Sequence, residues 1–262
     1  MKVKKLQLVL MAILIAVPTL IFSQAKITGL QIIENVYNRE TGNDSQGDLT
    51  MSLINSRGDQ RVRTIKQFVK DFGNMEKSIM FFVSPADVRN TSFMSWSYDE
   101  AGKDDDQWIY LPALKKVKRI SSDSKSDYFM GSDFTYDDLG DRHPTEDNHK
   151  LLREETIDGE TCYVVESIPK DDEYMYSRTV TWIIKDKSIG LKKEFYDEDE
   201  ELLKTLTNKK YEKIKGYWTI LSSEMHNVQK DHTTKMDLAN VKLDTGIAAN
   251  KFTERMMKRG LK

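Results

Sequence analysis

Residues 83–139 decide the fold, and they read VSPADVRNTSFMSWSYDEAGKDDDQWIYLPALKKVKRISSDSKSDYFMGSDFTYDDL. The stretch holds two short aromatic-rich runs, a strand candidate that carries Trp108 and Tyr110 and ends at Pro112, and then a basic run. A loop follows in which aromatic residues are scattered among small and acidic ones. Because loops rarely carry core aromatics, the stretch predicts one wall and part of the mouth of an apolar cavity.

Two strand candidates in and beside this stretch, at residues 79–83 and 108–111, are apolar on both faces. Such a strand must be covered on both sides. A ligand cavity and an ordinary sandwich core can each supply that cover. If there is a cavity, its candidate ligand-binding lining is Met80, Phe82, Phe93, Trp96, Trp108, Tyr110, Phe129, Phe134 and Tyr136.

Outside this stretch, strand patterns dominate the chain. An amphipathic helix is predicted at residues 27–38 and a short helix within 248–261, while residues 121–148 form a long excursion with one helical turn near 135–139. The remaining segments give about ten or eleven strands, too many for a flat open sheet. We expect a mainly β (α+β) fold. A curled antiparallel sheet forms an unclosed half-barrel, roofed by the N-terminal helix and the central excursion.

The N-terminus has the order of a secretory signal peptide. Three lysines precede an apolar run over residues 6–22, and small residues follow. Cleavage after Ser23 or Ala25 fits this pattern, and an uncleaved anchor helix is the alternative because roughly 18–20 apolar residues span a bilayer. We expect residues 1–24 to be a signal peptide and residues 25–262 to be a single domain in the periplasm.

The bulk composition restricts the partners of the chain. It has 40 basic and 42 acidic residues, which give a formal net charge of −2. Nucleic acid is disfavoured as a partner because phosphate binding requires a basic face. The single Cys162 cannot form an internal disulfide, and its place in a strand candidate predicts a buried, inert thiol.

Three blocks of the sequence resemble a known family. They are residues 87–93 (DVRNTSF), 107–120 (QWIYLPALKKVKRI) and 129–139 (FMGSDFTYDDL). In these blocks the chain is similar to the outer membrane lipoprotein-sorting and lipid-carrier superfamily that includes LolA, LolB, LppX and RseB. It more closely resembles the bacterial branch of outer membrane lipoprotein-sorting proteins, often found beside RND-type transporters.

This LolA-like resemblance implies a non-catalytic carrier without cofactors. Its apolar interior takes the acyl chains of lipids or lipoproteins in the periplasm for transport towards the outer membrane. An RND-type or other inner-membrane transporter is the implied partner, with peripheral membrane contact and a monomeric state. The alternative is a sensory or regulatory binding module, similar to RseB, that acts on a membrane partner.

A basic run follows the strand that ends at Pro112. It could contact anionic lipid head groups or a membrane partner, because each charge near an anionic surface contributes about 1 kcal/mol. A solvated strand that guards a sheet edge is the alternative. The residues concerned are Lys115, Lys116, Lys118 and Arg119.

The other polar clusters match no familiar catalytic or metal motif. Residues 104–106 are three aspartates without the glycine and spaced oxygens of an EF-hand, which favours a solvated loop. Asp133, Asp137, Asp138 and His143 could be imagined as a general acid and base cluster, the basis of a weaker hydrolase hypothesis. The sequence has no nucleophile elbow, HExxH or phosphate-binding loop. We therefore expect no catalytic residue and no metal.

Overall fold

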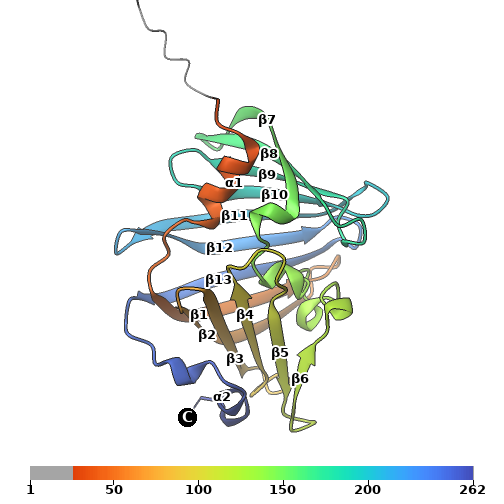
Figure 1. Cartoon of the computed structure of the whole chain (residues 1–262). Coiled ribbons are helices and arrows are strands. Elements are labelled where there is room, and N and C mark those ends of the chain that lie inside the picture. The colour runs from red at the N-terminus through yellow and green to blue at the C-terminus, as the bar shows by residue number, and fades with distance from the viewer. Residues whose placement is uncertain (1–25, 262) are drawn as a thin grey trace, which may run out of the picture.

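The computed structural model describes residues 26–261, so the predicted signal peptide lies outside the described residues. In this part of the chain thirteen strands form one sheet, in the order β6-β5-β4-β3-β2-β1-β13-β12-β11-β10-β9-β8-β7. All neighbours are antiparallel, and β6 and β7 are the two unpaired edges, so the curled sheet stays unclosed (Figure 1). The predicted mainly β half-barrel is confirmed.

The first six strands form one meander. The sheet has more strands than the ten or eleven predicted, and one of the additional strands is β6, formed by the basic run. Its side chains are mostly charged and exposed, so it lacks the apolar alternation that reveals a strand. The six strands of the first meander are β1 (Asp44–Ile54), β2 (Gln60–Asp71), β3 (Met75–Ser84), β4 (Ser92–Tyr98), β5 (Asp106–Leu111) and β6 (Lys116–Ile120).

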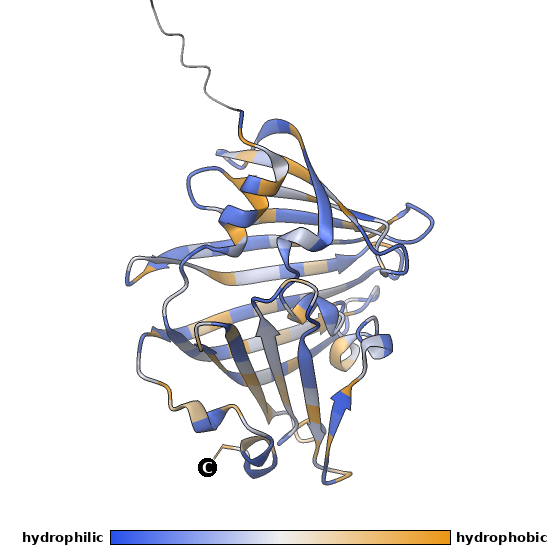
Figure 2. Ribbon diagram, viewed as in Figure 1, coloured by the Kyte–Doolittle hydropathy of each residue, from blue (hydrophilic) through white to orange (hydrophobic). Residues whose placement is uncertain are grey.

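A second meander of seven strands joins the first where β13 pairs with β1. Its first hairpin turns at Asp158 and Gly159, whose φ angles of 51° and 83° are both positive, as a type I′ turn requires. Apolar and polar residues alternate along most strands (Figure 2). The strands are β7 (Asp147–Ile157), β8 (Glu160–Pro169), β9 (Arg178–Ile184), β10 (Ile189–Tyr196), β11 (Leu202–Ile214), β12 (Tyr217–Asn227) and β13 (His232–Leu243).

Helix α1 (Gly29–Tyr37) confirms the predicted N-terminal helix and packs on β7 and β8. It begins with a capping box, because Thr28 and Gln31 each accept a hydrogen bond from the other's backbone N–H. Gly29 lies so close to the sheet that a Cβ atom there would meet the backbone of His149 at 2.8 Å. The absence of a side chain at this position lets the helix approach the strand.

Residues 121–146, which we call the crossing segment, connect edge strand β6 to edge strand β7. The segment must therefore pass across the open side of the curled sheet, and we call the face that it covers the inner face. The predicted helical turn near residues 135–139 is present as a short 3₁₀ helix. The crossing segment contains the 3₁₀ helices η1 (Ser122–Ser124), η2 (Phe129–Gly131), η3 (Asp137–Leu139) and η4 (Pro144–Glu146).

The C-terminal residues cover the opposite, outer face of the first meander (Figure 1). A 3₁₀ helix η5 (Ala249–Lys251) precedes helix α2 (Glu254–Arg259), which contacts β4 and β6. Phe252 and Met257 are buried there against Phe68 and Phe81. The predicted C-terminal helix is thus confirmed, and within residues 26–261 no helix has the length and apolar character needed to cross a membrane.

Candidate functional site

A cavity of about 910 Å³ lies between α1, the crossing segment and the inner face of the second meander. Its floor is apolar and comes from Phe195 on β10 and Leu206 on β11, with the fully buried Met225 on β12 in the same cluster as Phe195. Helix α1 adds Ile33 and Val36 to the wall. The volume falls within the range of about 300–1,000 Å³ that is usual for small-molecule sites.

One side of the cavity is acidic. We call its carboxylates the acidic pole: Asp71, Glu76 and Asp99 on the side of the first meander, Asp141 on the crossing segment, and Asp105, which lines an adjoining hollow of about 720 Å³ with Asp141. Burial, together with the neighbouring negative charges, raises the pKa of Glu76 to about 8. Burial also raises the pKa of Asp105 to about 6.

A smaller cavity of about 230 Å³ adjoins the first one. Arg39, Asp71 and Glu76 line both cavities, so two carboxylates of the acidic pole lie where the cavities meet. The smaller cavity has additional apolar walls from Val69 and Leu238. An elongated apolar molecule in either cavity would therefore lie beside Asp71 and Glu76.

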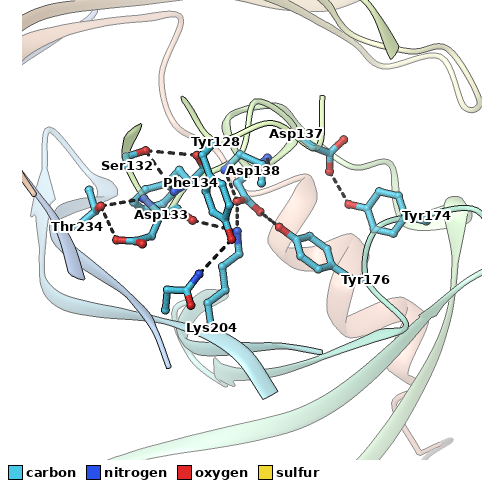
Figure 3. A network of polar contacts seen from close by, with 12 residues as sticks. Tyr128, Ser132, Asp133, Phe134, Asp137, Asp138, Tyr174, Tyr176, Lys204 and Thr234 are labelled. Carbon is cyan, nitrogen blue, oxygen red and sulfur yellow. Dashed lines mark hydrogen bonds and ion pairs between the residues drawn. The ribbon is translucent and has the colours of Figure 1, made fainter. Parts of the chain in front are cut away.

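A buried polar network holds the crossing segment over the floor of the cavity (Figure 3). Its centre is Lys204 on β11, which is fully buried. The Lys204 ammonium donates to the Oδ2 atom of Asp138 at 2.5 Å and to the backbone carbonyl of Asp133 at 3.0 Å. The Tyr176 hydroxyl donates to the other carboxylate oxygen of Asp138 at 3.0 Å. One charged pair thus joins the segment to the sheet.

The network continues to β13 through Asp133, which is 2 % exposed. The Thr234 hydroxyl donates to the Asp133 carboxylate at 2.7 Å, and the Nδ1 atom of His232 lies 2.7 Å from the same oxygen. On the other side, Tyr174 donates to Asp137 at 2.5 Å. These bonds satisfy buried polar groups and fix the segment in one position.

The imagined acid and base cluster is divided in the structure. Asp133, Asp137 and Asp138 belong to the buried network, where their oxygens accept hydrogen bonds from Thr234, Tyr174, Tyr176 and Lys204. His143 instead caps η4 through the backbone N–H of Thr145. The residues therefore serve to hold the crossing segment, and His143 does not join the three aspartates.

Of the nine predicted lining residues, Phe134 lines the large cavity. Five others form a packed core between the inner face of the sheet and the crossing segment, where the Phe129 ring is 5.0 Å from that of Phe93 and 6.0 Å from that of Phe82. Ligand binding by these five residues stays an untested prediction. They are Met80, Phe82, Phe93, Phe129 and Tyr136.

The remaining three, Trp96, Trp108 and Tyr110, pack on the outer face with the C-terminal residues. The Trp96 and Trp108 ring centroids are 4.9 Å apart, and the Lys77 ammonium lies 3.5 Å from the Trp96 ring centroid. The sheet separates these side chains from the inner cavity. Trp96, Trp108 and Tyr110 therefore do not contact a ligand in the inner cavity.

The basic run occupies the β5–β6 hairpin and the edge strand β6. Lys115 lies in the turn with a φ of 50°, while Lys116, Lys118 and Arg119 are exposed on β6. Arg119 pairs with Asp106. This is the solvated edge strand foreseen as the alternative, and contact with head groups or a partner stays a prediction.

Sequence reasoning missed the floor of the cavity and the acidic pole. The alternation of Lys193 and Phe195 placed both on one face of a strand, but it could not show that this face lines a cavity. The carboxylates of the acidic pole are spread over residues 71–141, and no local spacing unites them. Only the pairing of β2 to β5 and the path of the crossing segment bring them together.

Comparison with known proteins places this arrangement in a class. The crystal structure of a LolA superfamily protein from Nitrosomonas europaea is similar with a TM-score of 0.67 and 21 % identity, over 88 % of this chain and 100 % of that chain. At this identity the likeness concerns the fold. The chain thus shares the fold of that protein.

Two other structures are more similar in sequence. A DUF1329 family protein from Desulfovibrio piger is 34 % identical, with a TM-score of 0.83 over 87 % of this chain and 97 % of that chain. An outer membrane lipoprotein-sorting protein domain from Vibrio parahaemolyticus is 35 % identical, with a TM-score of 0.83 over 88 % of this chain and 98 % of that chain. A family model described as "Uncharacterized protein" matches residues 74–259, and no curated protein matches the chain. The chain belongs to the DUF1329 family.

Proposed function

We propose that the protein is a periplasmic carrier that holds the acyl chains of a lipid or lipoprotein in the large cavity. The observation that supports this most is an apolar floor of Phe195 and Leu206, roofed by α1 and the crossing segment within a cavity of about 910 Å³. Each buried methylene contributes about 0.8 kcal/mol, so a dozen would give roughly 10 kcal/mol before the costs of binding. The role is carriage without catalysis.

The proposal extends to delivery towards the outer membrane, with an RND-type or other inner-membrane transporter as donor. The β5–β6 hairpin is our candidate contact with anionic head groups or with that partner. Leu114 at its tip is 63 % exposed, and the exposed Lys115 and Lys116 follow it. An exposed apolar tip flanked by lysines suits a membrane surface, since apolar and electrostatic attraction then act together.

Lipid extraction tests the proposal directly. The full chain, exported and purified without detergent, should release acyl lipid close to one molecule per protein when the extract is analysed by mass spectrometry. Protein that is folded, free of acyl lipid and unable to take up a fluorescent fatty acid would contradict it.

Filling the cavity should weaken ligand binding. In Leu206→Trp a larger ring occupies the floor, so the affinity for a fluorescent fatty acid should fall at least about tenfold, the loss expected from about 1.4 kcal/mol. The matched control is Leu152→Trp on β7, where the side chain is 38 % exposed and lies outside the cavity lining. Equal binding by both variants would place the ligand elsewhere.

A vesicle assay separates a carrier from the sensory alternative. A carrier should move fluorescent lipid from donor to acceptor vesicles in proportion to its concentration. A stable complex with a membrane protein, without any lipid transfer, would instead support a module that regulates that partner.

A further inference from the structure

The charges around the cavities are unbalanced. Carboxylates outnumber cationic side chains in the linings of both the large cavity and the adjoining hollow. The cation Arg142 is already paired with Glu146 at 3.0 Å and with Asp147 at 2.7 Å. Lys193 stacks over the Phe195 ring at 4.9 Å. The third cation of the lining, Arg39, donates to the backbone carbonyl of Trp218 at 2.5 Å. The large cavity therefore presents a surplus of negative charge.

The acidic pole carries most of this surplus. Within residues 26–261, no lysine or arginine nitrogen lies within 4.0 Å of the carboxylates of Asp71, Glu76, Asp99, Asp105 or Asp141. The charges of the other four raise the pKa of Glu76 in addition to its burial. Like charges held together in a recess favour a cation, since its binding removes their mutual repulsion.

A second, independent feature lies beside the acidic pole. Gln107 on β5 is 1 % exposed and lines the adjoining hollow together with Asp105 and Asp141. Its Nε2 atom donates to the backbone carbonyl of Tyr136 at 2.9 Å, which fixes the orientation of the amide. The Oε1 atom is consequently left as a buried acceptor without a partner. A buried acceptor of this kind calls for an N–H or O–H donor.

The carboxylates of the acidic pole favour a cation, and the unpaired Gln107 oxygen favours a hydrogen-bond donor. A positively charged group that carries N–H bonds meets both requirements. We propose that the cargo has an ammonium head group, which binds against the acidic pole while the acyl chain covers the cavity floor. This inference rests on the proposed carrier function and names its ligand class. A carboxylate or phosphate head would meet repulsion at the same place.

Matched ligands test the head group. Dodecylammonium, dodecyl maltoside and dodecanoate share one chain and differ in head charge, and each can compete with an uncharged fluorescent alkyl alcohol below its micelle concentration. Dodecylammonium should bind about ten times more tightly than dodecyl maltoside, and dodecanoate most weakly, as expected for charges at a partly screened site. Equal affinities, or a preference for dodecanoate, would overturn the inference but leave the carrier function intact. No binding of any of the three would contradict the carrier function itself.

Variants that remove a carboxylate show which residues cause the preference for dodecylammonium. At pH 9, above the pKa of about 8 of Glu76, Glu76→Gln and Asp141→Asn each remove a negative charge and keep the side-chain shape. Each should then cut the preference for dodecylammonium several-fold without changing the affinity for dodecyl maltoside. The control Glu212→Gln removes an exposed carboxylate that pairs with Lys210 on β11. A preference that survives in Glu76→Gln and Asp141→Asn, or that falls equally in the control, would refute a specific role for the acidic pole. Circular dichroism confirms that each variant is folded.

Discussion

At the scale of single residues, Lys204 is the side chain on which the crossing segment depends most. It has no exposed surface, and its partner Asp138 has a side chain that is 5 % exposed. Removing one member of a buried ion pair leaves the other charge uncompensated, which typically costs about 3–5 kcal/mol. We expect Lys204→Met to lose that much stability in urea unfolding.

The exposed Lys210→Met is the control for this change, because the Lys210 side chain is 60 % exposed and its ion pair contributes little. Lys204→Met combined with Asp138→Asn should regain part of the lost stability, since the unpaired carboxylate is then gone. A loss below about 1 kcal/mol in Lys204→Met would show that the pair does not hold the segment.

Glu76 should make stability depend on pH. Its folded pKa of about 8 lies above the ordinary value of 4.5, so the folded chain binds more protons than the unfolded chain between these values. Stability therefore falls as pH rises through this window. Near pH 5 the melting temperature of Glu76→Gln should equal that of the parent, and near pH 9 it should be higher. Water in the cavity limits the gain in stability to about 1–2 kcal/mol. Each kcal/mol raises the melting temperature by about 2–4 °C.

A Glu76→Gln advantage that is the same at both pH values would contradict the raised pKa of Glu76. Glu212→Gln serves again as the matched control, because its carboxylate is exposed. Thermal melts followed by circular dichroism in buffers of equal ionic strength would give both curves.

At the scale of elements, the position of α1 depends on Gly29. A Cβ atom there would lie 2.8 Å from the backbone of β7 at His149 and Lys150, and backbone cannot move aside as a flexible side chain can. Gly29→Ala should therefore cost about 1–3 kcal/mol and displace the cavity wall formed by α1. The matched control is Gly190→Ala, whose Cβ would meet only the Thr181 methyl group at 3.6 Å. Equal urea midpoints for the two variants would contradict this account.

The elements themselves were largely predictable from sequence, because apolar alternation and turn residues are local signals. The side of the sheet to which each aromatic points was only half predictable. Phe93 and Trp96 are three residues apart on β4, and that spacing puts them on opposite faces of any regular strand. Which face would be covered by the crossing segment, and which by the C-terminal helix, depends on distant residues and could not be deduced from local spacing.

At the scale of the whole molecule, the order and connection of the strands bring the residues of the site together. The crossing segment joins the two edges of the sheet, and this connection brings Asp141 to the carboxylates of the first meander and Asp138 to Lys204 of the second. The family resemblance predicted an unclosed half-barrel with an apolar interior. The structure adds a mixed cavity, with an apolar floor in one meander and acidic residues from the other.

The most direct test of the central claim is a crystal structure of the full mature chain with a bromine-labelled alkyl chain, recorded at the bromine absorption edge. The account predicts an anomalous bromine peak within the large cavity, in contact with Phe195 and Leu206. Anomalous peaks confined to the outer face or to the surface, with the cavity filled only by water, would contradict it.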